Sequence, residues 1–255
     1  MPDDPKHAID DPRRAFLIRA LAAGLYASGL VVSGPVSANL LGQRPEKLEA
    51  GRSFYRIVGR VLVNGQLANL DTFISANDVI ETGKGSLAVF VVGEDAFLLR
   101  QNSRLELRGA SPGPMQTGGA TIQVVDFFNL LTGAVLTVFG KSSHRATTST
   151  AHIGIRGTGV YFESEPERSY VCTCYGSTEI VAQNDPTSRI EVVSRHHDAP
   201  QYVLRDGPAG QRIIRAPFKN HHDLELMLLE ELVGRTAPFL VSSDSYGAPR
   251  RGGGY

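Results

Sequence analysis

The sequence predicts a mainly β fold followed by one helix near the C-terminus. Between residues 56 and 215, short runs rich in β-branched and aromatic residues are separated by Gly, Asn, Asp and Pro. The clearest of these runs alternates apolar and polar residues with a period of two, as a half-buried strand does. No long helical pattern occurs before residue 220. Together, these observations favour an all-β domain with a C-terminal helix.

Composition and charge exclude several classes of protein. The chain has 255 residues with 26 basic and 26 acidic side chains, and therefore no net charge that would attract nucleic acid or an anionic membrane surface. Two cysteines are too few for a disulfide scaffold. A chain of this length buries enough apolar surface to fold without covalent cross-links. We therefore expect a globular domain with no nucleic-acid partner.

Residues 1–38 have the pattern of a twin-arginine export signal. Arg13 and Arg14 precede an apolar run of 13 residues from Ala20 to Val32, which is short for a membrane-spanning helix of roughly 20 residues. Small residues before Ala38 suit a signal peptidase. We expect cleavage after Ala38, a periplasmic location and no stable membrane span in the mature chain. An uncleaved inner-membrane signal anchor is the alternative.

A linker at residues 39–55 leads into the predicted strands. The runs Leu87–Val92, Val135–Phe139 and Ile57–Val63, the last broken by Gly59 and Arg60, are apolar on both faces and are expected to be central strands. Leu105 and Leu107 alternate with charged residues and predict a strand with one face in the core. Gly- and Pro-rich residues 109–120 are expected to form a flexible excursion from the sheet. Turn signals lie at Asn64-Gly65, Gly83-Lys84-Gly85, Gly93-Glu94-Asp95, Ser111-Pro112-Gly113-Pro114, Thr132-Gly133 and Asp206-Gly207.

Three ordered segments within residues 57–182 carry a family resemblance. The first is a Thr-containing loop and strand followed by alternating leucines, the second is a Leu-x-x-Gly-x-Val strand, and the third is an Arg-Gly-Thr motif before an aromatic residue. In this order they resemble the FecR family of periplasmic domains, named for the ferric-citrate signalling regulator. The segments are Glu81–Phe90 with Asn102–Leu107, Leu131–Val138, and the signature residues Arg156, Gly157, Thr158 and Phe162.

The resemblance implies an antiparallel, coiled or roll-like sheet over residues 56–182, solenoid-like or sandwich-like. Such a domain binds envelope proteins or cell-wall components and has no catalytic centre. In signalling members of the family, a cytoplasmic segment engages a sigma factor. Only twelve residues precede Arg13, so we do not expect that role here. The chain also has no His-Glu-x-x-His motif, nucleophile elbow or Gly-rich phosphate loop, and we do not expect an enzyme.

A cluster of cysteines and histidines follows the signature. Both cysteines and four of the seven histidines lie within 51 residues. Cys172 and Cys174 at spacing i, i+2 face the same side of a strand, with Cβ atoms roughly 7 Å apart, too far for the roughly 4 Å of a disulfide. Two thiolates at that spacing converge more readily on one metal ion, because a zinc–sulfur bond is about 2.3 Å long.

Two His-His-Asp elements supply the remaining ligands of this predicted site. Adjacent side chains point apart, so we expect one ring from His196 and His197 and one ring from His221 and His222. The resulting set of two sulfurs and two nitrogens suits zinc or iron, with copper less favoured. Asp198 and Asp223, beside the two pairs, are expected to accept the outer ring N–H groups.

Other interpretations of this cluster stay open. Cys-x-Cys is a weaker zinc pattern than Cys-x-x-Cys, and two small cysteines are common in a buried strand. The protein would then be a metal-free envelope scaffold. A redox-active thiol pair and a hydrolytic or redox metal enzyme with the same ligands are further alternatives. The favoured prediction is an exported FecR-type module that binds or senses in the periplasm and holds a structural or sensory metal.

One helix is predicted near residues 223–233, within a His-containing extension at residues 183–241. Asn220 or Asp223 is a suitable N-cap, and Gly234 is a suitable terminator. We expect the helix to pack against the sheet and seal an open edge. A flexible tail is predicted at residues 242–255. The expected apolar stripe consists of Leu224, Met227, Leu228 and Leu232.

Overall fold

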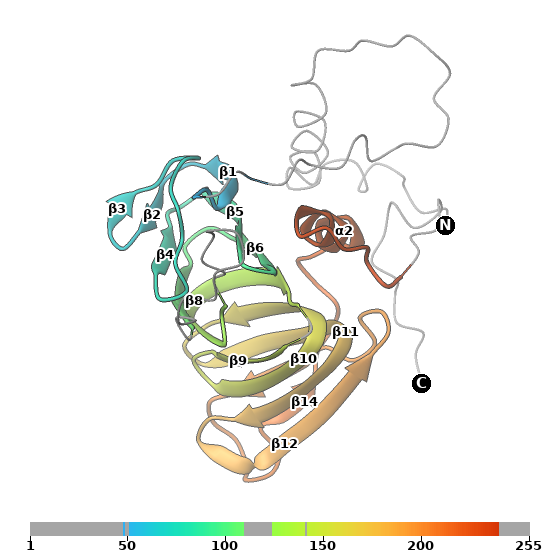
Figure 1. The fold of residues 1–255 in the computed structure, drawn as a ribbon. Coiled ribbons are helices and arrows are strands. Elements are labelled where there is room, and N and C mark those ends of the chain that lie inside the picture. Colours follow the sequence, from blue (N-terminus) through green and yellow to red (C-terminus); the bar gives the residue numbers. More distant parts are fainter. Residues whose placement is uncertain (1–47, 49–50, 110–123, 141, 240–255) are drawn as a thin grey trace, which may run out of the picture. The chain divides into compact units, whose positions relative to one another are not determined.

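The computed structural model describes residue 48 and residues 51–109, 124–140 and 142–239. Within these ranges the chain is mainly β, with a sheet of 14 strands and one helix near the C-terminal end (Figure 1). This confirms the predicted fold class.

The predicted leader, the tail and most of the Gly- and Pro-rich excursion lie outside the described residues, as does most of the predicted linker. Among the residues that the structure does describe, no helix has the length and apolar character needed to cross a membrane.

The strands are short at the N-terminal side of the sheet and long in its middle. Three long strands, β8, β10 and β11, cross the centre of the view in Figure 1. The strands are β1 (Phe54–Val58), β2 (Val61–Val63), β3 (Gln66–Leu67), β4 (Val79–Thr82), β5 (Leu87–Val92), β6 (Asp95–Leu99), β7 (Arg104–Arg108), β8 (Phe127–Val138), β9 (Ser143–Thr147), β10 (Ala151–Ser164), β11 (Arg168–Ala182), β12 (Asp185–Ser194), β13 (Gln201–Leu204) and β14 (Ile213–Arg215).

The main path of the sheet runs β14-β13-β11-β10-β9-β8-β7-β4-β2-β3. The ladders between described strands are antiparallel except for β8 with β9, which is parallel. The curved strand β8 pairs with β7 and β9 along its first half and with β6 and β10 along its second half. Because one strand takes part in two sets of ladders, the sheet coils on itself, as the roll-like prediction expects.

Local sequence explains where the first strands begin and end. Asn64 and Gly65 have φ angles of 51° and 79°, the left-handed conformation that a two-residue hairpin turn requires. The predicted run Ile57–Val63 is divided between β1 and β2 at the expected break, because Gly59 turns the chain with a φ of 69°. A Cβ atom at Gly59 would lie 2.4 Å from the hydroxyl of Ser86, so no larger residue fits there.

The predicted turn at Thr132-Gly133 is instead a bend inside β8. The register between β7 and β8 shifts at Thr132, and Gly133 has a φ of 88°. A Cβ atom at Gly133 would approach the hydroxyl of Ser103 to 2.1 Å. A glycine inside a strand marks a bend or a close approach as often as a turn, and here it allows β8 to change neighbours.

Stacked phenylalanine rings fill the core of the coil. Phe90 stacks on Phe97 with ring centroids 5.1 Å apart, and Phe128 contacts both Phe97 and the signature residue Phe162. All four rings are completely buried. Burial of each ring contributes about 2 kcal/mol, and the edge-to-face contacts add to this. Phe162 of the predicted signature is therefore a core residue.

Residues 183–239 continue the same sheet. Strands β12 and β13 both pair with β11, and β14 pairs with β13. Two loops emerge from this region, one between β12 and β13 and one after β14. These loops carry the two His-His-Asp elements back towards β11.

The predicted helix is α2 (Asp223–Leu232), with Gly234 directly after the C-cap as expected. The predicted N-cap, Asn220 or Asp223, was wrong: the N-cap is His222, and Asp223 is the first residue of the helix. It packs against β6 and β8, which are interior strands and not an open edge. The predicted apolar stripe was wrong in all but one residue. The buried residues of the helix are Glu225, Leu226, Leu229, Glu230 and Leu232.

Two buried carboxylates rotate the helix away from the expected stripe. Both oxygens of Glu225 lie 2.8 Å from the guanidinium of Arg100, at the end of β6. Glu230 pairs with Arg235 at 2.6 Å and accepts a hydrogen bond from the hydroxyl of Tyr175. Because buried carboxylates need such partners, the face that carries them turns inward.

Candidate metal centre

Strand β11 places both cysteines in the core. Cys172 and Cys174 are completely buried and are not joined by a disulfide. Opposite them on β10, Val160 pairs with Thr173 and Gly159 pairs with Tyr175, so Cys174 is the extra residue of a β-bulge. A bulge re-aims a side chain, and here the two sulfur atoms lie within 4.8 Å of each other.

His197 reaches the sulfurs from the loop that follows β12. Its main-chain N–H donates to the carbonyl of Cys174 at 2.9 Å, which docks the loop on β11. The φ angle of His197 is 53°, a conformation that non-glycine residues seldom adopt. In this conformation its Nδ1 atom lies 3.5 Å from the sulfur of Cys172.

His221 reaches the same place from the segment between β14 and α2. Its Nε2 atom lies 3.4 Å from the sulfur of Cys174 and 3.1 Å from Nδ1 of His197. Its Nδ1 atom lies 2.7 Å from the carbonyl of Lys219. A carbonyl only accepts, so Nδ1 carries the proton and Nε2 presents its lone pair to the sulfurs. The ring also stacks on Tyr161, with centroids 4.4 Å apart.

Asp223 sets the tautomer of His197 in the same way. One carboxylate oxygen lies 3.0 Å from Nε2 of His197. Because a carboxylate accepts the hydrogen bond, Nε2 of His197 donates, and Nδ1 presents its lone pair once the ring has lost its second proton. In their neutral forms both histidines therefore aim an unprotonated nitrogen at the cysteines, the arrangement that an acceptor on the outer nitrogen gives a metal ligand.

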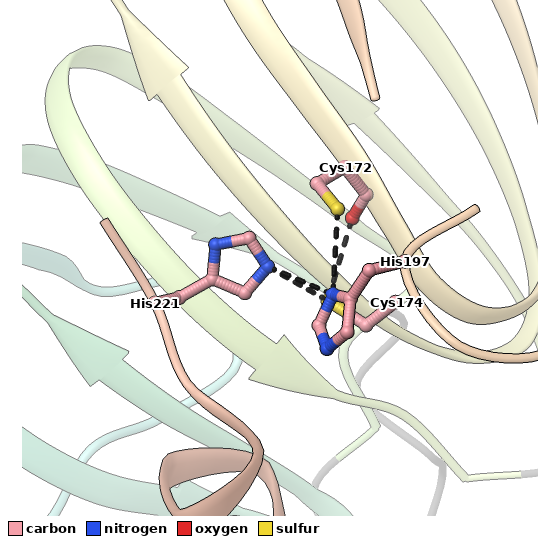
Figure 2. A group of neighbouring side chains, drawn as sticks. All are labelled: Cys172, Cys174, His197 and His221. Atoms are coloured by element: carbon pink, nitrogen blue, oxygen red, sulfur yellow. Dashed lines mark hydrogen bonds between the residues drawn. The ribbon is translucent and has the colours of Figure 1, made fainter. Parts of the chain in front are cut away.

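The four donor atoms of Cys172, Cys174, His197 and His221, here called the Cys-His cluster, lie within 4.8 Å of one another (Figure 2). Tetrahedral zinc with bonds of about 2.3 Å to sulfur and about 2.0 Å to nitrogen separates its ligands by about 3.6 Å for a sulfur and a nitrogen and about 3.3 Å for two nitrogens. Two of the four sulfur–nitrogen separations are 3.5 and 3.4 Å, the nitrogens lie 3.1 Å apart, and the other three separations are at most 4.8 Å. The donor set suits one tetrahedral ion, and the three shorter separations are close to those that such an ion imposes.

Three predicted site residues lie outside this cluster. His196 directs its Nε2 atom to Asp223 at 2.8 Å. His222 is the N-cap of α2, and its main-chain N–H donates to Glu225 at 3.0 Å. Asp198, the expected acceptor for a histidine ring, instead accepts from the main-chain N–H groups of the turn that begins at Arg195. An aspartate in a turn often accepts hydrogen bonds from the main-chain N–H groups of that turn. The His-His-Asp pattern alone does not show whether the aspartate binds these N–H groups or a histidine ring.

The interactions within the cluster shift the pKa values of Cys172, His197 and Cys174. Burial alone would raise the pKa of Cys172, but hydrogen bonds with Cys174 and His197 and the charge of His221 lower it well below the usual range. Burial opposes a charge on His197, yet its hydrogen bonds to Asp223 and Cys172 raise its pKa to about 9. Burial and the neighbouring Cys172 raise the pKa of Cys174. One thiolate is therefore already stabilised in this site, as metal binding requires.

Cys172, His197 and Asp223 also form a row of nucleophile, base and orienting carboxylate. Such a row serves catalysis only where a substrate reaches the sulfur. Both cysteine side chains are completely buried. A small ion needs no open pocket, so the burial favours metal ligation over nucleophilic catalysis.

A supporting network around His221 was not predicted from the sequence. Glu163 accepts hydrogen bonds from Lys219 at 2.5 Å, from Asn220 at 2.6 Å and from Tyr161 at 2.8 Å. Asn220, directly before His221, has a φ of 62°. Glu163 lies on β10, far from Lys219 in sequence, and the acceptor for His221 is a main-chain carbonyl. Neither the contacts of Glu163 nor the carbonyl that accepts from His221 could be recognised from a pattern of residues in the sequence.

The remaining signature residues lie on β10, where the strand is irregular. Arg156 is exposed, and Gly157 has a φ of 50°. The register between β10 and β11 shifts between Arg156 and Gly159. A Cβ atom at Gly159 would lie 2.5 Å from the ring of Tyr175. The backbone of Thr158 lies within this irregular stretch of β10.

Comparisons with known proteins give limited guidance. No protein family model matches the chain, and no curated protein matches it. Two crystal structures of a "putative anti-sigma factor" from Parabacteroides distasonis show partial likeness, each with 11% sequence identity and a TM-score of 0.39. The likeness covers 54% of this chain and 58% of that chain, so the chain spans a little over half of that protein's structure. The FecR resemblance and the export signal stay predictions.

Proposed function

We propose that this protein is an exported FecR-type module that binds or senses in the periplasm, with a structural or sensory metal ion, preferably zinc, in the Cys-His cluster. Iron is the second choice for the same donor set, and copper the third. Its partner is an envelope protein or a cell-wall component, as the resemblance to the FecR family implies. The chain has no net charge that would attract a polyanion.

The single observation that carries the proposal is the convergence of four donor atoms from three separate places in the sequence, all within 4.8 Å of one another. Each histidine has an outer acceptor that fixes the tautomer needed for ligation. Four protein ligands complete the coordination of zinc, which is typical of a structural site and leaves no open position for a water or substrate.

The metal has a mechanical role in this proposal. It joins β11, the loop after β12 and the segment that begins α2. Without the ion, hydrogen bonds, the ion pair between Arg100 and Glu225 and ring contacts such as that of His221 with Tyr161 hold these segments to the sheet. The buried thiolate of Cys172 is then stabilised by its hydrogen-bond partners, among them His197. Loss or gain of metal therefore changes how firmly residues 195–222 and α2 dock on the sheet.

Elemental analysis of the protein after native export and purification tests the proposal. We expect one equivalent of zinc or iron in the parent and none in the Cys172→Ser, Cys174→Ser double variant. His152→Ala, which removes an exposed histidine on β10, is the matched control and retains the metal. A parent without stoichiometric metal, or equal metal in the parent and the double variant, would contradict the proposed site.

Location is tested separately. We expect replacement of Arg13 and Arg14 by Lys to leave the protein in the cytoplasm, because the twin-arginine route requires the pair. The measurement is the ratio of periplasmic to cytoplasmic protein on an immunoblot. Unchanged export of the variant would show that the leader uses another route.

A further inference from the structure

A second group of donor atoms shares His197 with the Cys-His cluster. One ring nitrogen each of His196 and His197 and a carboxylate oxygen of Asp223 lie within 4.8 Å of one another. The carboxylate oxygen is 2.8 Å from His196 and 3.0 Å from His197. Two imidazoles and one carboxylate are donors that zinc and iron accept. This group is called the outer trio below.

The outer trio differs from the Cys-His cluster in its access to solvent. The side chains of His196 and Asp223 are 29% and 18% exposed. Cys172, Cys174 and His221 are each 0% exposed. An ion arriving from solvent therefore meets the outer trio first, whereas the sulfurs are reached only from within the protein.

His197 faces both groups through different nitrogens. Nδ1 points to Cys172 and His221, and Nε2 points to Asp223 and lies on the side of His196. A neutral imidazole has only one unprotonated nitrogen. With the proton on Nε2, the ring completes the Cys-His cluster. With the proton on Nδ1, directed at the sulfur of Cys172, Nε2 completes the outer trio.

The two groups are therefore alternative sites for one ion. Capture at the outer trio displaces the Nε2 proton of His197 to solvent and leaves the ring protonated on Nδ1. Transfer from the outer trio to the Cys-His cluster then moves the ring proton of His197 from Nδ1 to Nε2, with solvent carrying the exchange, and re-forms its hydrogen bond to Asp223. Thiol protons that remain on the cysteines leave to solvent as the sulfurs bind the ion, so charge and protons balance without any redox step.

We propose, on the basis of the proposed metal centre, that the outer trio is a capture site that takes a divalent cation from solvent and delivers it through His197 to the Cys-His cluster. His196 is the residue that belongs to the capture step alone. Asp223 serves both steps, because it also fixes the tautomer of His197 in the loaded protein.

Loading of metal-free protein with Co²⁺ under reducing conditions tests this proposal. The thiolate-to-cobalt absorption band reports arrival at the cysteines and is silent for the outer trio, which contains no sulfur. The proteins compared are the full-length parent, His196→Ala, and His152→Ala, which removes an exposed histidine of β10. Rates are measured by stopped-flow with cobalt at concentrations that do not saturate the rate.

We expect the band to grow about tenfold more slowly in His196→Ala, because loss of a contributing group weakens capture by about that factor. The band should still reach the final amplitude of the parent. His152→Ala should match the parent in rate and amplitude. Equal rates in all three proteins overturn the capture site and leave the metal centre standing. A lost final amplitude in His196→Ala also overturns it, since His196 would then support the inner site. A parent that shows no band refutes the metal centre itself.

Discussion

At the scale of single residues, the choice between neighbouring histidines is decided by backbone geometry. His197 and His221 enter the Cys-His cluster because a left-handed residue redirects the chain at each place, His197 itself in one loop and Asn220 before His221 in the other. The adjacent ring in each pair then points elsewhere. The sequence contains the two pairs, but only these backbone turns decide which ring of each pair reaches the sulfurs.

Replacement of each histidine of the second pair separates a ligand from its neighbour. We expect His221→Ala to weaken zinc binding by at least about 100-fold, because it removes a donor atom and leaves three. His222→Ala should keep zinc affinity within about threefold, with some loss of stability from the helix N-cap. Competition titration against a chromophoric chelator measures both. Equal losses for the two variants would contradict the assignment.

A second residue-scale prediction concerns Asp95, which is buried beside His144 and accepts from the main-chain N–H of Gly140 at 2.9 Å. Burial raises its pKa to about 6, even though His144, Gly140 and Arg235 favour the charged form. Glu94 adds to the rise. In the unfolded chain this carboxyl ionises near pH 4, so the unfolded state loses its proton first as pH rises. The stability that the protonated group contributes is therefore lost between about pH 4 and 6.

Asp95→Asn removes this titration and keeps an oxygen for Gly140. We expect the free energy of unfolding of the variant, relative to the parent, to rise by about 2 kcal/mol between pH 4 and pH 8. Urea unfolding at a series of pH values measures this difference. A difference that stays constant with pH, or falls, would show that the charged carboxylate is well accommodated.

At the scale of elements, α2 is attached through polar pairs as well as leucines. The helix was predictable in position, since its N-cap region, its length and Gly234 all follow known rules. The buried face of the helix could not be predicted, because it depends on contacts with Arg100 and Tyr175, which lie far from the helix in sequence. The strands show the same limit. Alternation located β7, whereas the bend at Gly133 depends on the approach of Ser103 from another strand.

The pair between Arg100 and Glu225 is expected to be the main anchor of α2. The side chain of Glu225 is fully buried and that of Arg100 is 11% exposed. Arg100→Ala leaves a buried carboxylate without its partner and should lower the free energy of unfolding by about 3 kcal/mol. Arg189→Ala, which breaks an exposed pair with Glu179, should cost less than about 1 kcal/mol. Similar losses in both variants, measured by denaturant unfolding, would contradict this role.

At the scale of the whole molecule, the fold class follows from residue patterns, and the coil follows from long-range pairing. Turn residues and period-two runs predict a sheet of short strands, but they do not show that β8 divides its length between two sets of neighbours. In the proposed metal site, too, part of the arrangement follows from residue patterns and part from long-range pairing. Cys-x-Cys and the two His-His-Asp elements predict the ligand types, while the coil of the sheet brings their loops together at β11.

Metal removal should therefore affect the stability of the whole domain. An ion that binds only the folded state, at about 1,000 times its dissociation constant, adds about 4 kcal/mol and raises the melting temperature of a domain of this size by about 10 °C. We expect a chelator to lower the melting temperature of the parent by about this amount. The Cys172→Ser, Cys174→Ser double variant should not respond. A parent insensitive to chelator would show that the ion does not join these elements.

X-ray absorption at the K-edge of the metal bound after native export tests the central claim most directly. The account predicts one ion per chain, with two sulfur neighbours at about 2.3 Å and two nitrogen neighbours at about 2.0 Å. The His197→Ala variant should show one nitrogen fewer or an oxygen in its place. A protein without metal, or an ion surrounded only by oxygen and nitrogen, would contradict a centre built from Cys172 and Cys174.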